Sequence, residues 1–346
     1  MATQPKVTDP PPRSIKAELA RLRAELDGKI PAKQLDKNLL IASWNIRGFG
    51  SVTKKWSSGP KDSPRRDLHA IRCISEIISR FDVVAVQEVK SNIQALRYTV
   101  KALGPNWGLI LTDVTKGKPG NAERMAYLFD TRKVQLSGLA CEIVVPKEQL
   151  HKGRKDEIKV DALDKQFART PYAVSFRSGG KTFILVTLHV LYGAKAVQRI
   201  PELRAIARWL ADWATNVNAY GHNLIALGDF NIDRKGDDRW QAFSSTGLAA
   251  PDDLNAVPRS IFHNPTKSST HKFYDQIAWF WGDEHASKSK KSKKTKAPPK
   301  LSLEYQRGGF FDFTTVALKS LNLTKTQLSW RLSDHYPLWV EFSVRD

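Results

Sequence analysis

Six short polar clusters along the chain contain side chains that could bind a metal ion and transfer protons. Each cluster follows or ends a run of apolar, mainly β-branched residues, and such runs predict β-strands. Because strand ends present loops on a rigid scaffold, we expect the clusters to gather at one edge of the fold. In chain order they are WNIRGFG (44–50), VQEVK (86–90), TLH (187–189), GDFN (228–231), FYDQI (273–277) and SDHYP (333–337).

Carboxylate and amide side chains of these clusters could hold a divalent cation and a phosphate. Glu88 ends the apolar run DVVAV, where a carboxylate needs a cation or a hydrogen-bond partner. Mg²⁺ prefers one or two carboxylates together with water and substrate oxygens. Asn45 could hold a phosphate oxygen or order a metal-bound water, Arg47 adds positive charge, and Asp229 and Asn231 could both face a phosphate. Taken singly, each has a structural alternative, such as an ordinary turn or a salt-bridged strand end.

Two histidines complete the set. His189 follows the run FILV, and His335 follows Asp334 directly. A lone histidine in either place is more often a satisfied core residue, but the clusters together supply every component of metal-assisted phosphodiester hydrolysis. A metal stabilises developing charge, a histidine oriented by a carboxylate takes a proton from water while an acid protonates the leaving oxygen, and Asn and Arg donors hold the remaining oxygens.

Composition limits the class of protein. The chain has 346 residues, is 41% hydrophobic, and contains 10 Trp and 15 Phe, which excludes a disordered protein. Its two cysteines, Cys73 and Cys141, exclude a disulfide framework and a thiolate zinc site. The net charge of +20 favours a polyanionic partner, such as a nucleic acid. No apolar run is long enough to span a membrane, and the first residues lack the apolar core of a secretion signal, so we expect an intracellular protein.

Periodicity divides the chain into two parts. Residues 1–37 combine a Pro-rich tail with a helix over 14–28, whose apolar stripe could pack on the domain or bind a partner. Residues 38–346 form the catalytic domain, with a Lys-rich segment at 286–300 that is either a solvated loop or a phosphate-binding arm. Helices are expected at 66–80, 91–103 and 197–215, and strands at 39–43, 82–87, 107–112, 125–130, 172–177, 182–188, 224–228, 275–281 and 337–343. Many strands with few helices between them predict two packed sheets with helices outside.

The clusters occur in the order seen in the endonuclease/exonuclease/phosphatase superfamily, and the chain resembles its deoxyribonuclease I-like branch over about residues 39–343. The resemblance implies a four-layered α/β sandwich of two packed, mainly antiparallel β-sheets flanked by helices. It also implies Mg²⁺-dependent (or Mn²⁺-dependent) hydrolysis of a phosphodiester at one edge of the sandwich. By the same resemblance, Glu88 is the principal metal ligand, Asn45 and Asp334 lie at the metal, and Asp229 and Asn231 hold the phosphate, the nucleophile or a second metal.

The resemblance also assigns the proton-transfer groups and the substrate contacts. His335 and His189 are the acid/base pair, with Asp275 orienting the first and Glu123 the second. The resemblance implies substrate contacts by Lys90 and Arg169, and we expect Arg47, which adds positive charge beside Asn45, to bind substrate as well.

These observations favour a divalent-metal nuclease acting on DNA, with double-stranded DNA as the favoured partner and internal cutting as the favoured mode. A relative that hydrolyses a small phosphoester or a lipid headgroup shares the same metal and histidine residues and remains the alternative. A non-catalytic binding module on this fold would be expected to lose a histidine or the metal-binding glutamate, and Glu88, His189 and His335 are all present.

Overall fold

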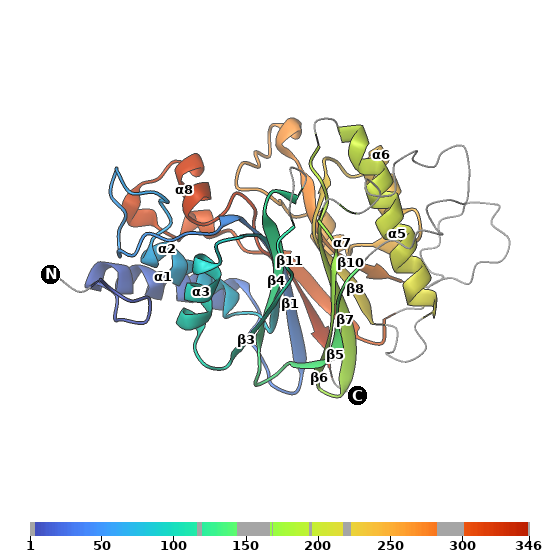
Figure 1. The fold of residues 1–346 in the computed structure, drawn as a ribbon, viewed down its shortest axis with the longest axis horizontal. Helices are drawn as coiled ribbons and strands as arrows, with labels where there is room; N and C mark the ends of the chain where they lie inside the picture. The colour runs from blue at the N-terminus through green and yellow to red at the C-terminus, as the bar shows by residue number, and fades with distance from the viewer. Residues whose placement is uncertain are drawn as a thin grey trace.

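The structure is a computed structural model that describes residues 4–115, 120–143, 167, 169–193, 196–216, 223–281 and 301–344. Two six-stranded β-sheets pack face to face, with helices on both outer faces (Figure 1). The predicted four-layered sandwich is confirmed. Each sheet contains one parallel pair, β1 with β2 and β7 with β8, and its other pairs are antiparallel.

The strands of each sheet come from distant parts of the chain. In spatial order, the first sheet contains β11 (Glu304–Phe310), β12 (Leu338–Ser343), β1 (Asn38–Phe49), β2 (Val83–Lys90), β4 (Glu123–Asp130) and β3 (Trp107–Leu111). The second contains β5 (Gln135–Glu142), β6 (Tyr172–Ser178), β7 (Lys181–His189), β8 (Leu224–Ile232), β10 (Phe273–Phe280) and β9 (Leu248–Ala249).

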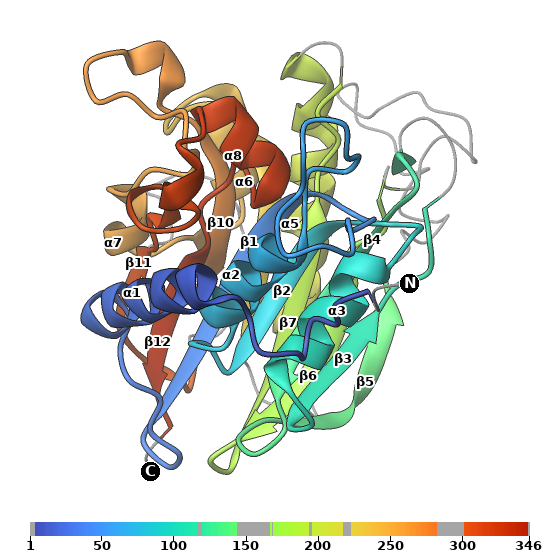
Figure 2. The same ribbon diagram turned by 90° about the vertical axis from the view of Figure 1, so that its left-hand side faces the viewer.

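Helices cover the outer face of each sheet. Figure 2 shows the face of the first sheet, which is covered by α1 (Arg13–Lys29), α2 (Leu68–Ile78), α3 (Gln94–Leu103) and α8 (Lys325–Arg331). On the other side of the molecule, α5 (Arg199–Asn216) and α6 (Asp238–Ser244) lie against the second sheet, and the short α7 is Asp252–Asn255 (Figure 1). None of the helices in the described part of the chain is both long and apolar enough to cross a membrane.

Burial on both faces explains the apolar strands. Successive side chains of a strand point to opposite faces of its sheet. In β1, Leu39 and Ile41 pack in the cluster between the two sheets, whereas Leu40 and Ala42 pack in the cluster beneath the helices. The strand therefore reads as a continuous apolar run, as expected for a strand covered on both faces.

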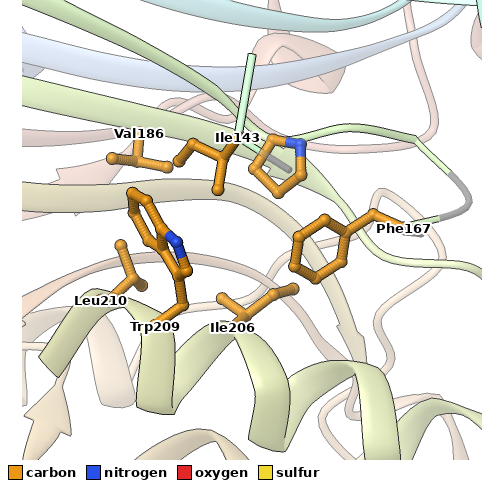
Figure 3. A pocket seen from close by; sticks show the side chains of 7 residues that line it. Ile143, Phe167, Val186, Ile206, Trp209 and Leu210 are labelled. Carbon is orange, nitrogen blue, oxygen red and sulfur yellow. The ribbon is translucent and has the colours of Figure 1, made fainter. Parts of the chain in front are cut away.

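The contact between α5 and the second sheet is apolar. Figure 3 shows Ile206, Trp209 and Leu210 of α5 facing Val186 of β7 around a small cavity. The residues that line this cavity are all apolar, with Ile143, Phe167 and Pro171 completing it. Because a phosphorylated substrate needs polar partners, this cavity is a packing feature and the chemistry lies elsewhere.

The amphipathic helix predicted over 14–28 is present as α1 and packs on the domain. Ile15, Leu19, Leu22 and Leu26 are buried in the same cluster as the residues of α2. The Lys-rich segment 286–300 lies outside the described residues.

Some predicted boundaries were wrong. The strand expected over 39–43 continues to Phe49, so most of the WNIRGFG cluster lies within β1. The strand expected over 224–228 likewise continues to Ile232 and contains the GDFN cluster. The sequence interpretation also missed several elements, namely β5, β9, β11, α6, α7 and α8.

Candidate active site

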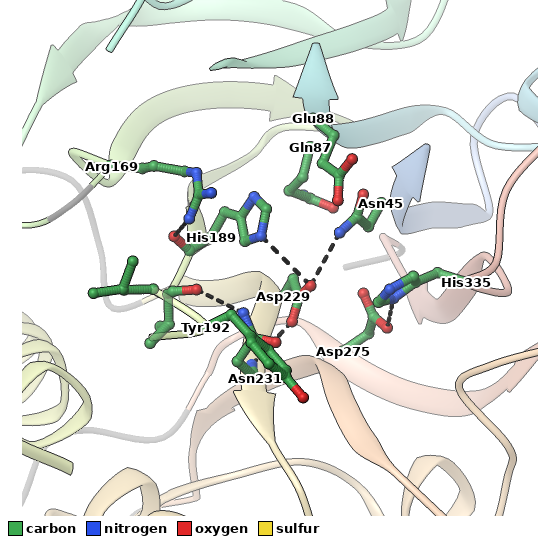
Figure 4. Close-up of polar contacts among 12 residues, drawn as sticks. Asn45, Gln87, Glu88, Arg169, His189, Tyr192, Asp229, Asn231, Asp275 and His335 are labelled. Atoms are coloured by element: carbon green, nitrogen blue, oxygen red, sulfur yellow. Dashed lines mark hydrogen bonds and ion pairs between the residues drawn. The ribbon is translucent and has the colours of Figure 1, made fainter. Parts of the chain in front are cut away.

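The polar clusters meet at one end of the two sheets, where strand register aligns them. His189 of β7 pairs with Asp229 of β8, and Asp229 pairs with Asp275 of β10, so three predicted site residues share one row of the second sheet. Asn45 of β1 comes from the facing sheet, and its Nδ2 donates to Asp229 Oδ2 at 3.0 Å. Figure 4 shows these residues, with His335, gathered around a common point.

Asp229 lies at the centre of the site and is buried. Its Oδ1 accepts the backbone N–H of Asn231 at 2.9 Å, and its Oδ2 lies 3.7 Å from Nε2 of His189. Asn231 adopts a φ of 51°, and its side-chain Nδ2 donates to the carbonyl of Val190 at 2.6 Å. The amide of Asn231 thus ties the end of β8 to the end of β7, and its backbone N–H fixes the orientation of the Asp229 carboxylate.

Unusual backbone conformations position two of the clusters. Gly228 has a φ of 139°, and a Cβ there would lie 2.0 Å from the carbonyl oxygen of Leu188, so only glycine fits directly before Asp229. Glu88 has a φ of 60° where the register between β1 and β2 shifts. Its carboxylate accepts the backbone N–H of Gly48 at 2.8 Å. Strained conformations of this kind are typical of functional sites.

His335 pairs with a buried carboxylate. Nδ1 of His335 lies 2.6 Å from Oδ2 of Asp275, and Arg259 Nε donates to the carbonyl of Asp275 at 3.0 Å. Burial favours the neutral form of both groups and raises the pKa of Asp275 to about 6. For His335, burial lowers the pKa, but the carboxylates of Asp275, Asp229 and Asp334 together outweigh burial and raise it well above the ordinary value. The short contact with Asp275 holds the imidazole in one orientation and favours its protonated form.

His189 has the equivalent arrangement on the other side of Asp229. Nδ1 of His189 lies 3.2 Å from Oε2 of Glu123, which also lies 2.6 Å from Nε of Arg169. Lys90 Nζ and Asn121 Nδ2 approach the other carboxylate oxygen at 2.7 and 2.5 Å. Burial raises the pKa of Glu123, but the contact with His189 and the charges of Arg169 and Lys90 outweigh burial and lower the pKa to about 2. Glu123 is therefore ionised at neutral pH and lies beside Nδ1 of His189.

The donor atoms fit a hard divalent cation. Asn45 Oδ1 and Asp275 Oδ1 are buried and have no hydrogen-bond partner within the described part of the chain. Asp229, Asp275 and His335 each offer a ligand atom, and these atoms lie within 4.8 Å of one another. Glu88 projects beside Asn45 in Figure 4. Oxygen-rich sets of this type suit Mg²⁺ or Mn²⁺ better than softer metals.

The remaining predicted residues lie around these two histidine–carboxylate pairs. Asp334 lies 3.6 Å from Nη1 of Arg47, so its carboxylate contacts that guanidinium. Lys90 and Arg169, predicted to bind substrate, both contact Glu123, and Arg169 Nη1 also approaches the carbonyl of His189 at 3.5 Å. Lys90 and Arg169 thus hold the Glu123 carboxylate beside His189 and also add positive charge to the site.

Sequence reasoning missed several residues around the site. Arg66 and Arg259 are buried and bind backbone carbonyls, and Trp330 lies against Arg47. Tyr274 lies beside the ring of His335, with 5.9 Å between ring centroids. Nothing in the local sequence distinguishes Arg66 and Arg259 from other arginines. Trp330, by contrast, is an aromatic residue only four positions before Asp334, and that position could have indicated a place at the site.

Comparison with known proteins identifies the family to which the chain belongs. The sequence profile of the Endonuclease/Exonuclease/phosphatase family matches residues 42–291. A deoxyribonuclease of Thioalkalivibrio sp. (strain K90mix) is 31% identical over 201 residues, which are 56% of this chain but only 46% of that protein. Deoxyribonuclease gamma of Homo sapiens is 24% identical over 328 residues, covering 88% of this chain and 85% of that protein.

Solved structures show the same fold. The mannosyl-6-phosphatase of Bacteroides thetaiotaomicron VPI-5482 superposes with a TM-score of 0.52 at 17% identity, covering 88% of this chain and 99% of that chain. TDP2 of D. rerio, solved with a single-strand DNA product, gives 0.51 at 14% identity, covering 88% and 98%. At these identities the likeness concerns the fold alone, but the profile covers more than half of the sequence. The chain therefore belongs to the endonuclease/exonuclease/phosphatase family, whose members hydrolyse phosphoester bonds.

Proposed function

We propose that this protein is a divalent-metal-dependent nuclease that hydrolyses phosphodiester bonds within DNA. One observation carries the proposal: two histidines, each paired with a buried carboxylate, flank Asp229 at the end of the sandwich. His335 is paired with Asp275, and His189 with Glu123. A phosphodiester placed between two such histidines has a proton acceptor on one side and a proton donor on the other.

The two histidines have separate roles in this proposal. His335, held by Asp275, takes the proton of the attacking water, and His189, held by Glu123, gives a proton to the leaving oxygen. The carboxylates of Asp275, Asp229 and Asp334 all raise the pKa of His335. Action as a base therefore requires that part of this negative charge be neutralised in the working enzyme.

Glu88, Asn45 and Asp229 are the residues that would hold the cation, with Asp334 close to the same end of the site. A bound Mg²⁺ or Mn²⁺ would supply charge neutralisation for the phosphoryl oxygens. The chain itself orients the side chains that would hold the cation, because the hydrogen bond between Asn45 and Asp229 joins the two sheets at this point. Arg169 adds a buried guanidinium beside His189.

Charge and relatives support DNA as the substrate. The net charge of +20 suits a long polyanion better than a small phosphoester. Two relatives are named as deoxyribonucleases. Internal cutting of double-stranded DNA is the mode we propose.

Nicking of supercoiled plasmid with Mg²⁺ tests the proposal. His189→Ala and His335→Ala should each lower the rate at least about 100-fold, since each removes a proton-transfer group. EDTA should stop the reaction, and Mg²⁺ or Mn²⁺ should restore it. Circular dichroism and thermal unfolding check that both variants remain folded, and full nicking by either folded variant would refute the proposal.

A substrate panel separates this function from the small-substrate alternative. Supercoiled plasmid, abasic duplex, RNA and sphingomyelin are compared at equal enzyme concentration. We expect the highest kcat/KM on DNA. A higher value on sphingomyelin would replace the nuclease assignment with lipid headgroup hydrolysis.

A further inference from the structure

Arg47 and Trp330 form an aromatic–cation pair at the rim of the site, which we call the rim platform. The Arg47 guanidinium lies over the Trp330 ring, 3.8 Å from its centroid. Trp330 is nevertheless 52% exposed, although large aromatic side chains are usually buried in this protein. An exposed indole ordered by a guanidinium offers both an apolar surface and positive charge.

The rim platform is held in place before any substrate arrives. Arg47 Nη1 binds Ser329 Oγ at 2.9 Å and lies 3.6 Å from Asp334. The helix α8, which carries Trp330, begins with a capping box formed by Thr324 and Gln327. Arg47 and the helix that carries Trp330 are therefore both held in place, so these groups lose little conformational entropy when a ligand binds.

A buried arginine joins the two segments that carry the rim platform. The Arg66 guanidinium donates to four backbone carbonyls at 2.6–3.1 Å. Two of these carbonyls belong to the end of β1 and two to the end of α8, and they are those of Arg47, Gly48, Arg331 and Leu332. Burial lowers the pKa of Arg66 to about 10, so it remains charged at neutral pH.

The rim platform is also connected to the catalytic residues. Ser333 Oγ accepts the backbone N–H of Arg47 at 3.2 Å and that of His335 at 3.1 Å. The same hydroxyl donates to the carbonyl of Asn45 at 2.6 Å. A single serine therefore fixes the position of Arg47 relative to both His335 and Asn45.

We propose that the rim platform binds a nucleotide next to the scissile phosphate, with the Trp330 ring against its sugar or base and Arg47 on its phosphate. This inference rests on the proposed nuclease function and specifies how that site would distinguish a polynucleotide from a small phosphodiester. A nucleotide offers an apolar ring face and an anion together, which matches the two parts of the rim platform. Stacking of a base on an aromatic side chain contributes about 5-fold to 150-fold in affinity.

Trp330→Ala tests the inference, because loss of a binding contact should change KM and kcat for DNA to different extents. We expect the KM for DNA to rise about 10-fold with a much smaller change in kcat, and Trp330→Phe to recover most of the loss. Hydrolysis of bis(p-nitrophenyl) phosphate, which has no flanking nucleotide, should fall far less than hydrolysis of DNA. Leu136→Ala, which removes an exposed apolar side chain from β5, is the matched control and should leave both substrates unaffected.

Two results would overturn the inference: an unchanged KM for DNA in Trp330→Ala, or an equal loss on DNA and on the small diester. Fluorescence anisotropy with a labelled duplex in EDTA separates this inference from the proposed function. If the wild-type protein fails to cut DNA but Trp330→Ala still weakens duplex binding, the nuclease assignment fails and the rim platform remains. If His335→Ala abolishes nicking while Trp330→Ala binds duplex as the wild type does, only the rim platform fails.

Discussion

Asp229 is the residue at which contacts from both sheets converge. It accepts hydrogen bonds from Asn45 of the first sheet and from Asn231 of its own strand, and it lies near His189. These contacts fix the orientation of the carboxylate between the two sheets. The geometry of the candidate site therefore depends on the packing of one sheet on the other, as well as on local loop structure.

Glu123 is expected to contribute stability that depends on pH. Its pKa in the folded protein is about 2, below the ordinary value of 4.5, so its contribution is present above pH 4.5 and is lost as pH falls towards 2. The shift corresponds to at most about 3 kcal/mol. Urea unfolding of Glu123→Gln at pH 6, 4.5 and 3 should show a loss of stability against the wild type that shrinks at acid pH.

The control for this measurement is Glu304→Gln, which alters an exposed carboxylate on β11. We expect this variant to unfold close to the wild type at each pH. A difference between Glu123→Gln and the wild type that stays constant from pH 6 to pH 3 would contradict the role assigned to the charge of Glu123.

The sequence carried more information about some site residues than about others. His335 with Asp275 and His189 with Glu123 were expected as pairs, and both contacts are present. The resemblance to the endonuclease/exonuclease/phosphatase superfamily, carried by short motifs, implied these pairs. Arg66 gave no such signal, because its partners are backbone carbonyls up to 266 positions away in the sequence.

At the scale of elements, α1 is part of the folded domain. Leu22 and Leu26 are fully buried in the cluster that also contains α2. Leu22→Ala should lower the free energy of unfolding by about 2–5 kcal/mol, because it removes buried methyl groups and leaves a cavity. Urea unfolding measures the loss, and Arg21→Ala on the exposed side of the same helix is the control. Equal stabilities for the two variants would show that α1 does not pack as described.

The strands covered on both faces were predictable. Of the four edge strands, β3 was expected from the sequence, whereas β5, β9 and β11 were not. The run 172–177 corresponds to β6 and the run 182–188 to β7, each within one residue. By contrast, β5 is largely exposed and β11 contains two adjacent glycines, so neither shows a clear apolar pattern. The helix α8 has only seven residues, and tertiary contacts rather than periodicity maintain it.

At the scale of the whole molecule, part of the positive charge is built into the fold beside the site. Asp233, two residues after Asn231, is approached by Arg199 at 2.9 Å, Lys272 at 3.1 Å and Arg239 at 3.3 Å. Arg239 also pairs with Asp237, so three cations meet two carboxylates and one positive charge is left in excess. This excess lies on the folded domain and is separate from the lysines of residues 286–300.

The salt dependence of DNA binding tests how much of this positive charge contacts the phosphates of DNA. Measured in EDTA, the logarithm of the affinity should fall linearly with the logarithm of salt concentration, with a slope of about −0.9 for each phosphate contact. Deletion of residues 286–300 removes seven lysines and leaves a net charge of +13. We expect the shortened protein to keep most of the slope, because the contacts at the folded site remain. If the deletion removes most of the salt dependence, phosphate binding belongs to the Lys-rich segment instead. If the affinity of the wild type does not change with salt concentration, the result contradicts a polyanionic substrate.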